Sequence, residues 1–415
     1  LFNTKLNNFN NFVNDFNLSK KWDGVKVNAG LYKGIQNVSM SWLWNSYLQE
    51  VSDNNARMID VKNALGQSLS PNGLLAYGVP AWGNCCTRNY DTQYDVTAPY
   101  AQIEINAIEK LSLDFGARYD IGNVTGSFAG GNGQTAAIDM NGNGNIDPNE
   151  QKVSTVGNNI TPVDYDYNIF GYSVGANYSI NEKNAVFARI SKGGSASADR
   201  ILFSGYNYTN TDDPALDAVK VNEVKQLEGG YKLRGAGFYL NTTLFYANTL
   251  EANYEATTQR KTENDYQSVG VELDGYYRLN KTFEVRGGLT YTNAEIKDAI
   301  DKTIVGNTPR RTPKLMYNLN PNVNLGKVST GFFLIGASKA YAQDNNSLVM
   351  PSYIVVNPYL SYQFTKNLGA SINGNNIFDA IGVTEAEEGS IPTNGIVRGR
   401  PLPGRSLSMS LKFDF

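Results

Sequence analysis

The sequence has no histidine and only two cysteines. Without histidine, this chain cannot supply a Ser-His-Asp or Cys-His catalytic group, or a histidine ligand for zinc or haem. A net charge of -3 gives no basic surface of the kind that binds nucleic acid. No stretch reaches the roughly 18 consecutive apolar residues that a membrane helix needs, so a helical membrane protein is excluded as well.

The sequence is rich instead in residues that favour strands and turns. Its 415 residues include 40 glycines and 26 tyrosines, with 41% hydrophobic and 18% charged residues. Gly, Asn, Thr, Tyr and Val recur throughout, and these residues support strands, turns or loops better than long helices. We therefore expect an all-β protein that is large and polar on average.

Several segments alternate between apolar and polar residues with a period of two, which indicates strands whose two faces meet different surroundings. In the C-terminal segment, Leu407, Met409, Leu411, Phe413 and Phe415 alternate with serine, lysine and aspartate. The segments 170–180 and 269–279 follow the same pattern. Because a soluble β-sandwich would alternate in the same way, the connections between strands must decide between the two folds.

The pattern predicts fifteen strands whose connections alternate between short turns and long loops. The expected strands are 8–19, 25–44, 92–107, 111–124, 166–180, 184–193, 222–233, 237–253, 263–279, 283–297, 314–325, 328–342, 350–364, 368–378 and 405–415. The long loops are 45–91, 125–165, 194–221, 254–262, 298–313, 343–349 and 379–404. Short turns at one rim and long loops at the other are typical of an antiparallel transmembrane β-barrel, with periplasmic turns and extracellular loops.

An aromatic residue recurs at one height on the strands that run toward the short turns. The triplets with this aromatic, each just before a turn or the C-terminus, are Phe16–Leu18, Tyr178–Ile180, Tyr231–Leu233, Tyr277–Leu279, Tyr362–Phe364 and Phe413–Phe415. Aromatic residues at one height are what the periplasmic girdle of a barrel requires. We also expect Phe413 and Phe415 to act as the C-terminal signal for barrel assembly.

The expected number of strands is odd, whereas a closed bacterial barrel with both termini in the periplasm has an even number. The first expected strand already runs toward the short turns. We therefore expect residues 1–415 to form the C-terminal part of a single larger barrel whose early strands are absent from this sequence.

Several motifs resemble those of TonB-dependent outer-membrane receptors. They are Ala98–Gln102, Leu111–Asp120, Phe187–Gly193, Glu223–Lys232, Asn373–Asp379 and Gly399–Ser406. Their order and their placement on strands make the resemblance specific from about residue 91 to residue 415. The resemblance implies a barrel of about 22 strands in the outer membrane of a Gram-negative bacterium. It also implies an N-terminal plug with a TonB-binding box, which this sequence does not contain.

The resemblance implies transport and not catalysis, with no organic cofactor. The long loops would bind a scarce extracellular ligand, a ferric siderophore ahead of a carbohydrate, and TonB-derived energy would drive its import. Expected partners are the TonB complex through the plug, outer-membrane lipid and lipopolysaccharide, and the small-molecule ligand. A surface lipoprotein or another outer-membrane protein is a further candidate partner. The alternatives are a passive porin and a structural or adhesion barrel in a surface assembly.

The expected loop 125–165 contains a twelve-residue pattern that fits a calcium-binding loop. Side-chain oxygens stand at positions 1, 3, 5, 9 and 12, a backbone carbonyl at position 7 and glycine at position 6. The candidate ligands are Asp139, Asn141, Asn143, Asn145, Asp147 and Glu150. Because two side-chain donors are neutral asparagines, we expect a modest affinity of roughly 10⁻⁴–10⁻³ M. The alternative is an ordinary surface loop rich in Asn and Gly.

The remaining candidate residues lie in other loops or on the inward face. Cys85 and Cys86 are adjacent, and in an oxidising envelope they would form a vicinal disulfide or stay as two reduced thiols. The candidate ligand contacts in the loops are Tyr206, Tyr208, Tyr254, Arg310 and Arg311; the alternative is that exposed loops are simply polar. The charged residues expected to form pairs on the inward face are Arg118, Arg189, Glu223, Lys225, Glu228, Glu272 and Arg286.

Overall fold

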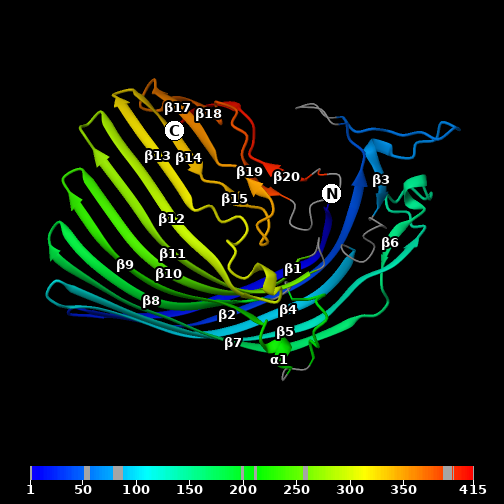
Figure 1. The fold of residues 1–415 in the computed structure, drawn as a ribbon, viewed down its shortest axis with the longest axis horizontal. Helices are drawn as coiled ribbons and strands as arrows, with labels where there is room; N and C mark the ends of the chain where they lie inside the picture. The colour runs from blue at the N-terminus through cyan, green and yellow to red at the C-terminus, as the bar shows by residue number, and fades with distance from the viewer. Residues whose placement is uncertain are drawn as a thin grey trace.

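The computed structural model describes residues 2–50, 57–77, 87–197, 201–209, 213–255, 260–386, 395 and 397–414. Its main feature is one strongly curved antiparallel sheet (Figure 1). The helices of the described residues are single turns, such as α1 (Pro214–Asp217). None of these helices is long and apolar enough to cross a membrane. The all-β prediction is confirmed.

The main sheet contains 17 strands. Two of them are short additions, β3 (Leu74–Tyr77) and β6 (Val153–Val156), and the other fifteen follow one another in sequence order. These fifteen wall strands are β1 (Phe2–Trp22), β2 (Val25–Tyr47), β4 (Arg88–Ile108), β5 (Leu111–Ala136), β7 (Thr161–Asn181), β8 (Asn184–Ala196), β9 (Val221–Gly235), β10 (Phe238–Glu255), β11 (Arg260–Arg278), β12 (Phe283–Ala299), β13 (Leu315–Leu325), β14 (Val328–Ala337), β17 (Tyr353–Gln363), β18 (Leu368–Asn375) and β21 (Ser406–Phe413). Each of the fifteen expected strands therefore exists.

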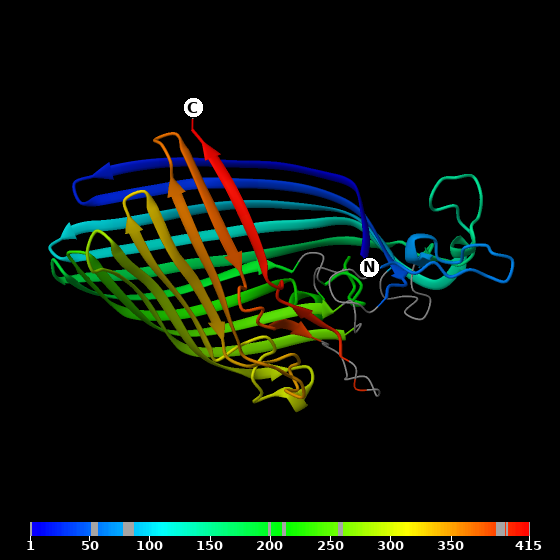
Figure 2. The same ribbon diagram turned by 90° about the horizontal axis from the view of Figure 1, so that it is seen from above.

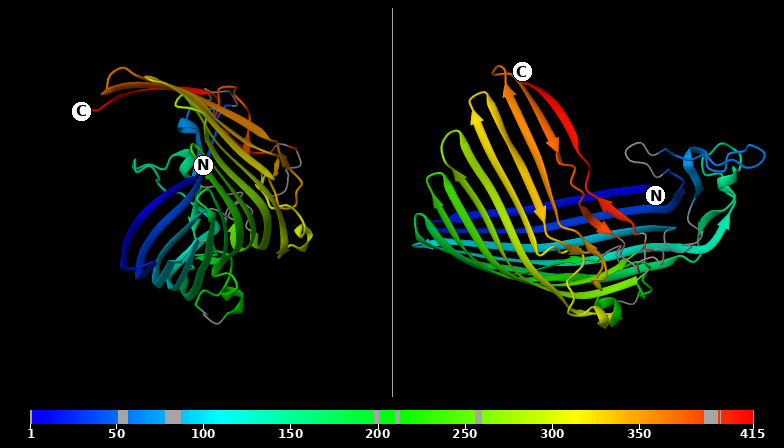
Figure 3. Two further views of the ribbon diagram at one scale, coloured as in Figure 1. Left: turned by 90° about the vertical axis from the view of Figure 1, so that its left-hand side faces the viewer. Right: turned by 45° about the horizontal axis from the view of Figure 1, so that its top comes forward.

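β1 and β21 are the two edges of this wall. Among the described residues, β1 pairs only with β2, and β21 pairs only with β18. The twist between neighbouring strands curls the sheet around a central space, as Figures 2 and 3 show. The described residues thus form a curved wall with antiparallel neighbours throughout.

The alternation seen in the sequence gives the wall two different faces. On β9 and β10, Leu227 and Leu244 are 54% and 62% exposed, and they lie on what we call the outer face. The opposite, inner face carries Arg189 and Glu228, which are partners in the β8–β9 register. An apolar face turned outward and a polar face turned inward are expected for strands that cross a lipid bilayer around a polar interior.

Short turns join the wall strands at one end and long loops join them at the other, as the sequence predicts. The residues of the expected aromatic girdle are all exposed at the turn end; they are Phe16, Tyr178, Tyr231, Tyr277, Tyr362 and Phe413. The girdle prediction therefore agrees with the structure. Phe415 lies outside the described residues, so the assembly signal of Phe413 and Phe415 stays a prediction.

Some strands extend further toward the long loops than expected. β5 continues to Ala136 and β7 begins at Thr161, well beyond the expected limits of residues 124 and 166. The reason is that apolar alternation marks only the part of a strand that faces hydrocarbon, whereas backbone pairing continues through polar residues. β14 and β17 are shorter than expected, because residues 340–341 and 349–350 pair separately as β15 (Ala340–Tyr341) and β16 (Val349–Met350).

Two of the charged residues assigned to the inward face lie on the outer face. Lys192 shares the outer face with Ile190, and its ammonium is 2.7 Å from Glu223 Oε1. Glu223 and Lys225 are therefore outward, because they alternate with the inward Glu228 along β9. The expected inward pairing holds for Arg189, whose Nη2 is 2.9 Å from Asp114 Oδ1.

Candidate functional site

The long connection between β8 and β9 folds back onto the inner face of the wall. The loop side chains that are almost fully buried are Ile201, Leu202, Tyr208, Leu216 and Val219. They belong to one apolar cluster with Val38, Tyr90, Val124, Phe128, Val163, Tyr165, Tyr167, Ile169 and Ala252. Most of these wall residues lie on the inner face of β2, β4, β5 and β7, near the loop end. This apolar cluster therefore holds the described parts of this loop, 201–209 and 213–220, against the wall.

The two tyrosines predicted as ligand contacts in this loop have different environments. Tyr208 is 2% exposed, and its hydroxyl donates a hydrogen bond of 2.6 Å to the carbonyl of Ile201. Tyr206 is half-buried, and its hydroxyl donates a hydrogen bond of 2.8 Å to Glu263 Oε1, while the Lys261 ammonium is 3.8 Å from the ring centre. Burial raises the pKa of both phenols, and Glu263 raises that of Tyr206 further. Tyr208 thus anchors the loop, and Tyr206 retains surface for a ligand.

A stacked arginine fixes the same loop to β2 and β4. The Arg88 guanidinium lies between the rings of Trp42 and Phe203, with its central carbon 4.0 Å and 4.5 Å from the ring centres. Phe203 also contacts Phe128 edge-to-face, with ring centres 4.6 Å apart. Arg88 is 7% exposed, and cation–π contacts strengthen when water is excluded. No local pattern indicates this contact, because Phe203 lies more than a hundred residues beyond Arg88 in the chain.

A second group of loops is tied together at the ends of β12 and β14. The Asn307 side-chain amide donates to the Asp344 carbonyl at 2.9 Å, and the Arg310 amide donates to Asp344 Oδ1 at 2.8 Å. A small buried cluster supports the loop 300–314; its members are Ile296, Ala299 and Ile304. The loops 300–314 and 338–352 therefore form one packed unit.

Arg310 and Arg311 are neighbours in sequence but meet different partners. Arg310 Nε lies 3.9 Å from Asp344 Oδ2, whereas Arg311 Nη2 lies 2.9 Å from Glu385 Oε1. The other oxygen of Glu385 is 2.8 Å from Arg400 Nη1. Glu385 and Arg400 are on β19 (Val383–Ala386) and β20 (Gly399–Pro401), which pair as a hairpin. We call this group the arginine cluster; in it, two guanidinium groups share one carboxylate.

The sequence predicts only one member of the arginine cluster as a ligand contact. That member is Arg311; Arg400 belongs to the family-like motif 399–406, and no sequence pattern marks Glu385. The backbone of Arg311 gives a further sign of a special position, because its φ of 58° is uncommon for a residue other than glycine. Its amide donates a 2.7 Å hydrogen bond to the carbonyl of Tyr341, so a third loop helps to hold it.

The protein family is identified by a match over most of the chain and not by any single residue. Residues 2–377 match the sequence family described as "TonB dependent receptor-like, beta-barrel". The chain belongs to this family. Its members are receptors of the Gram-negative outer membrane and are not enzymes, so the predicted location, fold family and class of this receptor are confirmed.

The receptor is distantly similar to longer proteins of known name. It is 26% identical over 227 residues to the rhizobactin receptor of Rhizobium meliloti, which covers 50% of this chain and 28% of that protein. It is 28% identical over 200 residues to the ferrichrome outer membrane transporter/phage receptor of Escherichia coli, covering 42% and 26%. The solved structure of the ferric yersiniabactin uptake receptor FyuA from Yersinia pestis has the same fold, with a TM-score of 0.68 and 15% identity over 100% of this chain and 55% of that one. This chain therefore spans about half of such a receptor.

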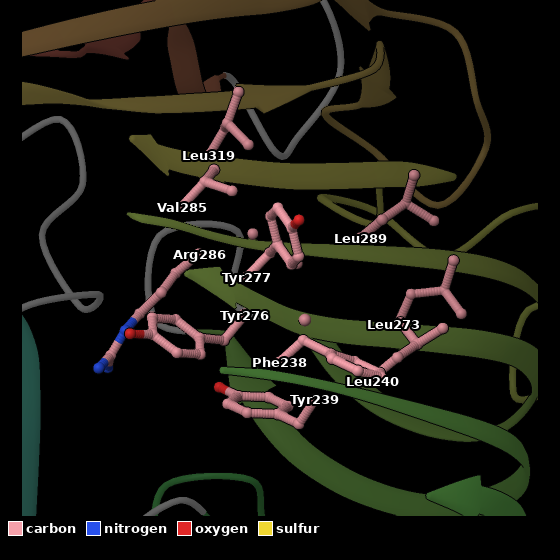
Figure 4. A pocket seen from close by; sticks show the side chains of 13 residues that line it. Phe238, Tyr239, Leu240, Leu273, Tyr276, Tyr277, Val285, Arg286, Leu289 and Leu319 are labelled. Carbon is pink, nitrogen blue, oxygen red and sulfur yellow. The ribbon is translucent and has the colours of Figure 1, made fainter. Parts of the chain in front are cut away.

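The inner face of the receptor also has a polar recess on β10–β17. Its lining includes Tyr239, Asp274, Glu284, Arg286, Asn318, Asn320, Asn322 and Tyr359. Glu284 Oε2 accepts a 2.7 Å hydrogen bond from the Tyr276 hydroxyl. Figure 4 shows Tyr239, Tyr276 and Arg286 pointing to one side of the wall and Leu240, Leu273 and Leu289 pointing to the other. Amides, phenols and ion pairs make this recess a polar contact surface.

The calcium candidate of the receptor is a compact loop whose carboxylates accept hydrogen bonds from its own backbone. Asp139 Oδ2 accepts from the Gly144 amide at 2.8 Å, and the fully buried Glu150 carboxylate accepts from the Met140 and Asn141 amides at 3.0 Å. Gly144, at position 6, has the positive φ of 82° that the pattern requires. Within the described ranges, no three acidic, cysteine or histidine side chains gather as a metal site. Calcium binding stays a prediction.

Two other predictions concern residues that the structure does not describe. Cys85 and Cys86 lie outside the described residues, so their redox state stays open between a disulfide and two thiols. The backbone of Tyr254 belongs to β10, but its side chain also lies outside the described part of the chain. The predicted ligand contact through Tyr254 therefore stays a prediction.

Proposed function

We propose that the chain is the C-terminal part of an active-transport receptor that binds a ferric siderophore with its extracellular loops and imports it with TonB-derived energy. The observation that supports this cargo is the presence of rhizobactin and ferrichrome receptors among the relatives. The plug and its TonB-binding box belong to the proposal, as does the energy coupling. The wall itself contributes a sheet whose paired backbone groups tolerate the surrounding lipid.

The arginine cluster supports an anionic cargo. Ferric complexes of carboxylate and catecholate siderophores carry negative charge, and the guanidinium group binds such oxygen pairs in a bidentate manner. In the free receptor, the Glu385 carboxylate occupies the space between Arg311 and Arg400. A carboxylate or catecholate oxygen of the ligand would replace Glu385 there and would gain two charge-assisted hydrogen bonds.

Tyr206 offers a second contact of a different kind. Its ring is covered on one side by the Lys261 ammonium, and its hydroxyl is held by Glu263. An aromatic ring beside a cation suits a ligand that combines aromatic and anionic groups, such as a catecholate. Tyr208 beneath it keeps the loop in place, so we assign Tyr208 a positioning role.

Uptake of radioactive iron into iron-starved cells tests this function. Cells that produce the full-length receptor should take up at least one ferric siderophore, and removal of TonB should abolish the uptake. The double substitution Arg311→Gln and Arg400→Gln should weaken binding by about tenfold or more, because a hydrogen bond to a charged group contributes roughly 1.5–3 kcal/mol. Lys302→Gln is the matched control, since this exposed lysine belongs to the same loop group but pairs with Asp298.

Other outcomes would support other functions. Receptor-dependent growth on an oligosaccharide, without any siderophore uptake, would identify a carbohydrate receptor. Steady ion conductance of the full-length protein in planar bilayers without TonB would identify a passive porin. A stable protein partner that covers the loops 125–165 and 194–221 would favour a structural or adhesion barrel.

A further inference from the structure

Glu385 holds the place in the arginine cluster that an anionic ligand would take. Its Oε1 is 2.9 Å from Arg311 Nη2, and its Oε2 is 2.8 Å from Arg400 Nη1. Each oxygen of this carboxylate therefore meets a different guanidinium group. Two such donors around two oxygens fit the oxygen pair of a carboxylate or a catecholate. Glu385 thus already presents the chemical group that the proposed cargo would bring.

The two arginines reach Glu385 from different elements. Arg400 on β20 is the register partner of Glu385 on β19, so this pair lies within one hairpin (Figure 1). Arg311 belongs to the loop 300–314, where its amide donates a hydrogen bond to the carbonyl of Tyr341. Backbone contacts therefore place both arginines, and their placement does not depend on the side chain of Glu385.

The side chain of Glu385 can leave the cluster without unfolding the loops. It is 32% exposed, and the side chains of Arg311 and Arg400 are 36% and 75% exposed. Ion pairs that water reaches to this extent contribute little to stability. The carboxylate of Glu385 can therefore turn into water while an incoming anion takes its place between the two arginines.

Asp344 in the neighbouring ion pair has a different role. Its side chain is only 13% exposed, and its Oδ1 accepts a 2.8 Å hydrogen bond from the Arg310 amide. Its carbonyl accepts a further hydrogen bond from the Asn307 side chain. Asp344 therefore stabilises the packed loops, whereas Glu385 is the more exposed carboxylate and contacts guanidinium groups that a ligand can reach.

We propose that Glu385 is a specificity-determining residue that competes with the cargo for Arg311 and Arg400. A ligand gains from the cluster only if it supplies an anionic oxygen pair that replaces this carboxylate. Ferric complexes of carboxylates and catecholates meet this condition, whereas a neutral hydroxamate complex does not. Glu385 lowers the affinity for all anions and so excludes those that contact only one arginine. This inference rests on the proposed function, because it concerns the same cluster and the same class of cargo.

The direction of the change in affinity separates a competitor from a structural residue. Glu385→Gln keeps the size of the side chain and removes its charge. Full-length receptor in detergent is titrated with ferric citrate, with the ferric complex of 2,3-dihydroxybenzoate and with neutral ferrichrome. At least one of the two anionic complexes should bind about three- to tenfold more tightly to the variant, because two exposed ion pairs hold Glu385 only weakly.

Ferrichrome serves as the internal reference in this titration, and its affinity should not change. If neither anionic complex gains affinity, the proposal is overturned, because a carboxylate that only positions the arginines would support binding. An equal gain for ferrichrome would overturn it as well. Heat-modifiable migration on gels shows that each variant is folded.

Asp298→Asn is the matched control variant. It removes the same charge from an exposed carboxylate at the end of β12, which pairs with Lys302 and not with the arginine cluster. The affinity for the anionic complexes should stay at the wild-type level. A gain equal to that of Glu385→Gln would assign the effect to the net charge of the loops and would overturn the proposal.

Chemical modification of arginine tests the occupancy of the cluster without any iron complex. Phenylglyoxal labels guanidinium groups, and mass spectrometry of peptides locates the labels. Arg311 should react faster in Glu385→Gln than in the wild type, because its partner has lost its charge. Citrate alone should protect Arg311 at a lower concentration in the variant. Unchanged reactivity of Arg311 would overturn the proposal.

Failure of this inference and failure of the proposed function give different results. Faster labelling of Arg311 in Glu385→Gln, without any TonB-dependent iron uptake by the wild type, would support the competitor and refute the siderophore function. Iron uptake by the wild type, with unchanged affinity and labelling in Glu385→Gln, would support the function and refute the competitor.

Discussion

At the scale of single residues, two tyrosines separated by one position have different tasks. Tyr208 is inside the apolar cluster and cannot meet a ligand without the loop unfolding, whereas Tyr206 is at its surface. The sequence pattern treats them as equivalent, because both belong to an aromatic-rich loop. The difference arises from the direction of each side chain relative to the inner face of the wall.

Tyr208→Ala should release the loop from the wall. Removal of a buried aromatic side chain costs roughly 3–5 kcal/mol, of which the lost packing is the main part. Tyr208→Phe should cost about 1 kcal/mol, because it removes the hydroxyl contacts with Ile201 and Ser204 but keeps the packing of the ring. The rate of protease cleavage within residues 197–220 measures this opening. Equal cleavage of the alanine variant and the wild type would contradict the anchoring role.

The contact between Tyr206 and Glu263 should depend on pH. The folded-state pKa of Tyr206 lies above the ordinary value of 10.0, so the folded loop keeps a proton that the released loop gives up. This stabilisation is therefore fully present below pH 10 and is lost as the pH rises through the raised pKa. Protease cleavage of the loop should accelerate in that range. Tyr206→Phe, which has no proton to lose, should flatten this response.

At the scale of elements, the strands were predictable and the loops were not. Period-two alternation identified each wall strand, because the bilayer imposes an apolar outer face on every one of them. It failed at strand ends such as Ala136 and Thr161, where polar residues continue the ladder beyond the hydrocarbon. The loops contain no such periodicity, so their packing on the inner face could not be predicted.

The loop around Gly144 should respond to calcium if the twelve-residue pattern is a binding loop. Millimolar calcium should protect the segment 137–152 from proteases, because the ion would bind the carboxylates of Asp139 and Glu150. Asp139→Asn with Glu150→Gln should remove the protection, since two of the three charged candidate ligands are lost. Asp91→Asn, on the outer face of β4, is a suitable control. Identical cleavage with and without calcium would leave an ordinary surface loop.

At the scale of the whole molecule, the two faces of the wall should tolerate charge differently. Leu244→Lys places an ammonium on the outer face within the hydrocarbon and should destabilise the barrel by about 2–4 kcal/mol. Thr243→Lys, one residue away, faces inward beside Glu272 and should have little effect. Guanidinium unfolding in lipid vesicles measures the difference. Similar stabilities for the two variants would mean that the faces are assigned wrongly.

One prediction at this scale is wrong, namely the face of the wall on which Glu223 and Lys225 lie. The sequence prediction groups Glu223 and Lys225 with the inward Glu228, although they precede it by five and three positions, which are odd offsets and therefore place them on the opposite face. The structure puts Glu223 beside Lys192 on the outer face. Charge alone indicated the interior, but alternation decides the face, and outward charges are allowed where a strand rises above the hydrocarbon.

The sequence by itself determined the all-β class, the fifteen strands, and the apolar and polar faces of the wall. It also determined which end of the wall has short turns and which end has long loops. It could do so because the bilayer acts on each strand locally and leaves a period of two in every segment. Only the tertiary structure decided that Arg311 and Arg400 share Glu385 and that Tyr208 is buried. These contacts join residues far apart in the chain, and they depend on strand register and loop packing, which no local pattern encodes.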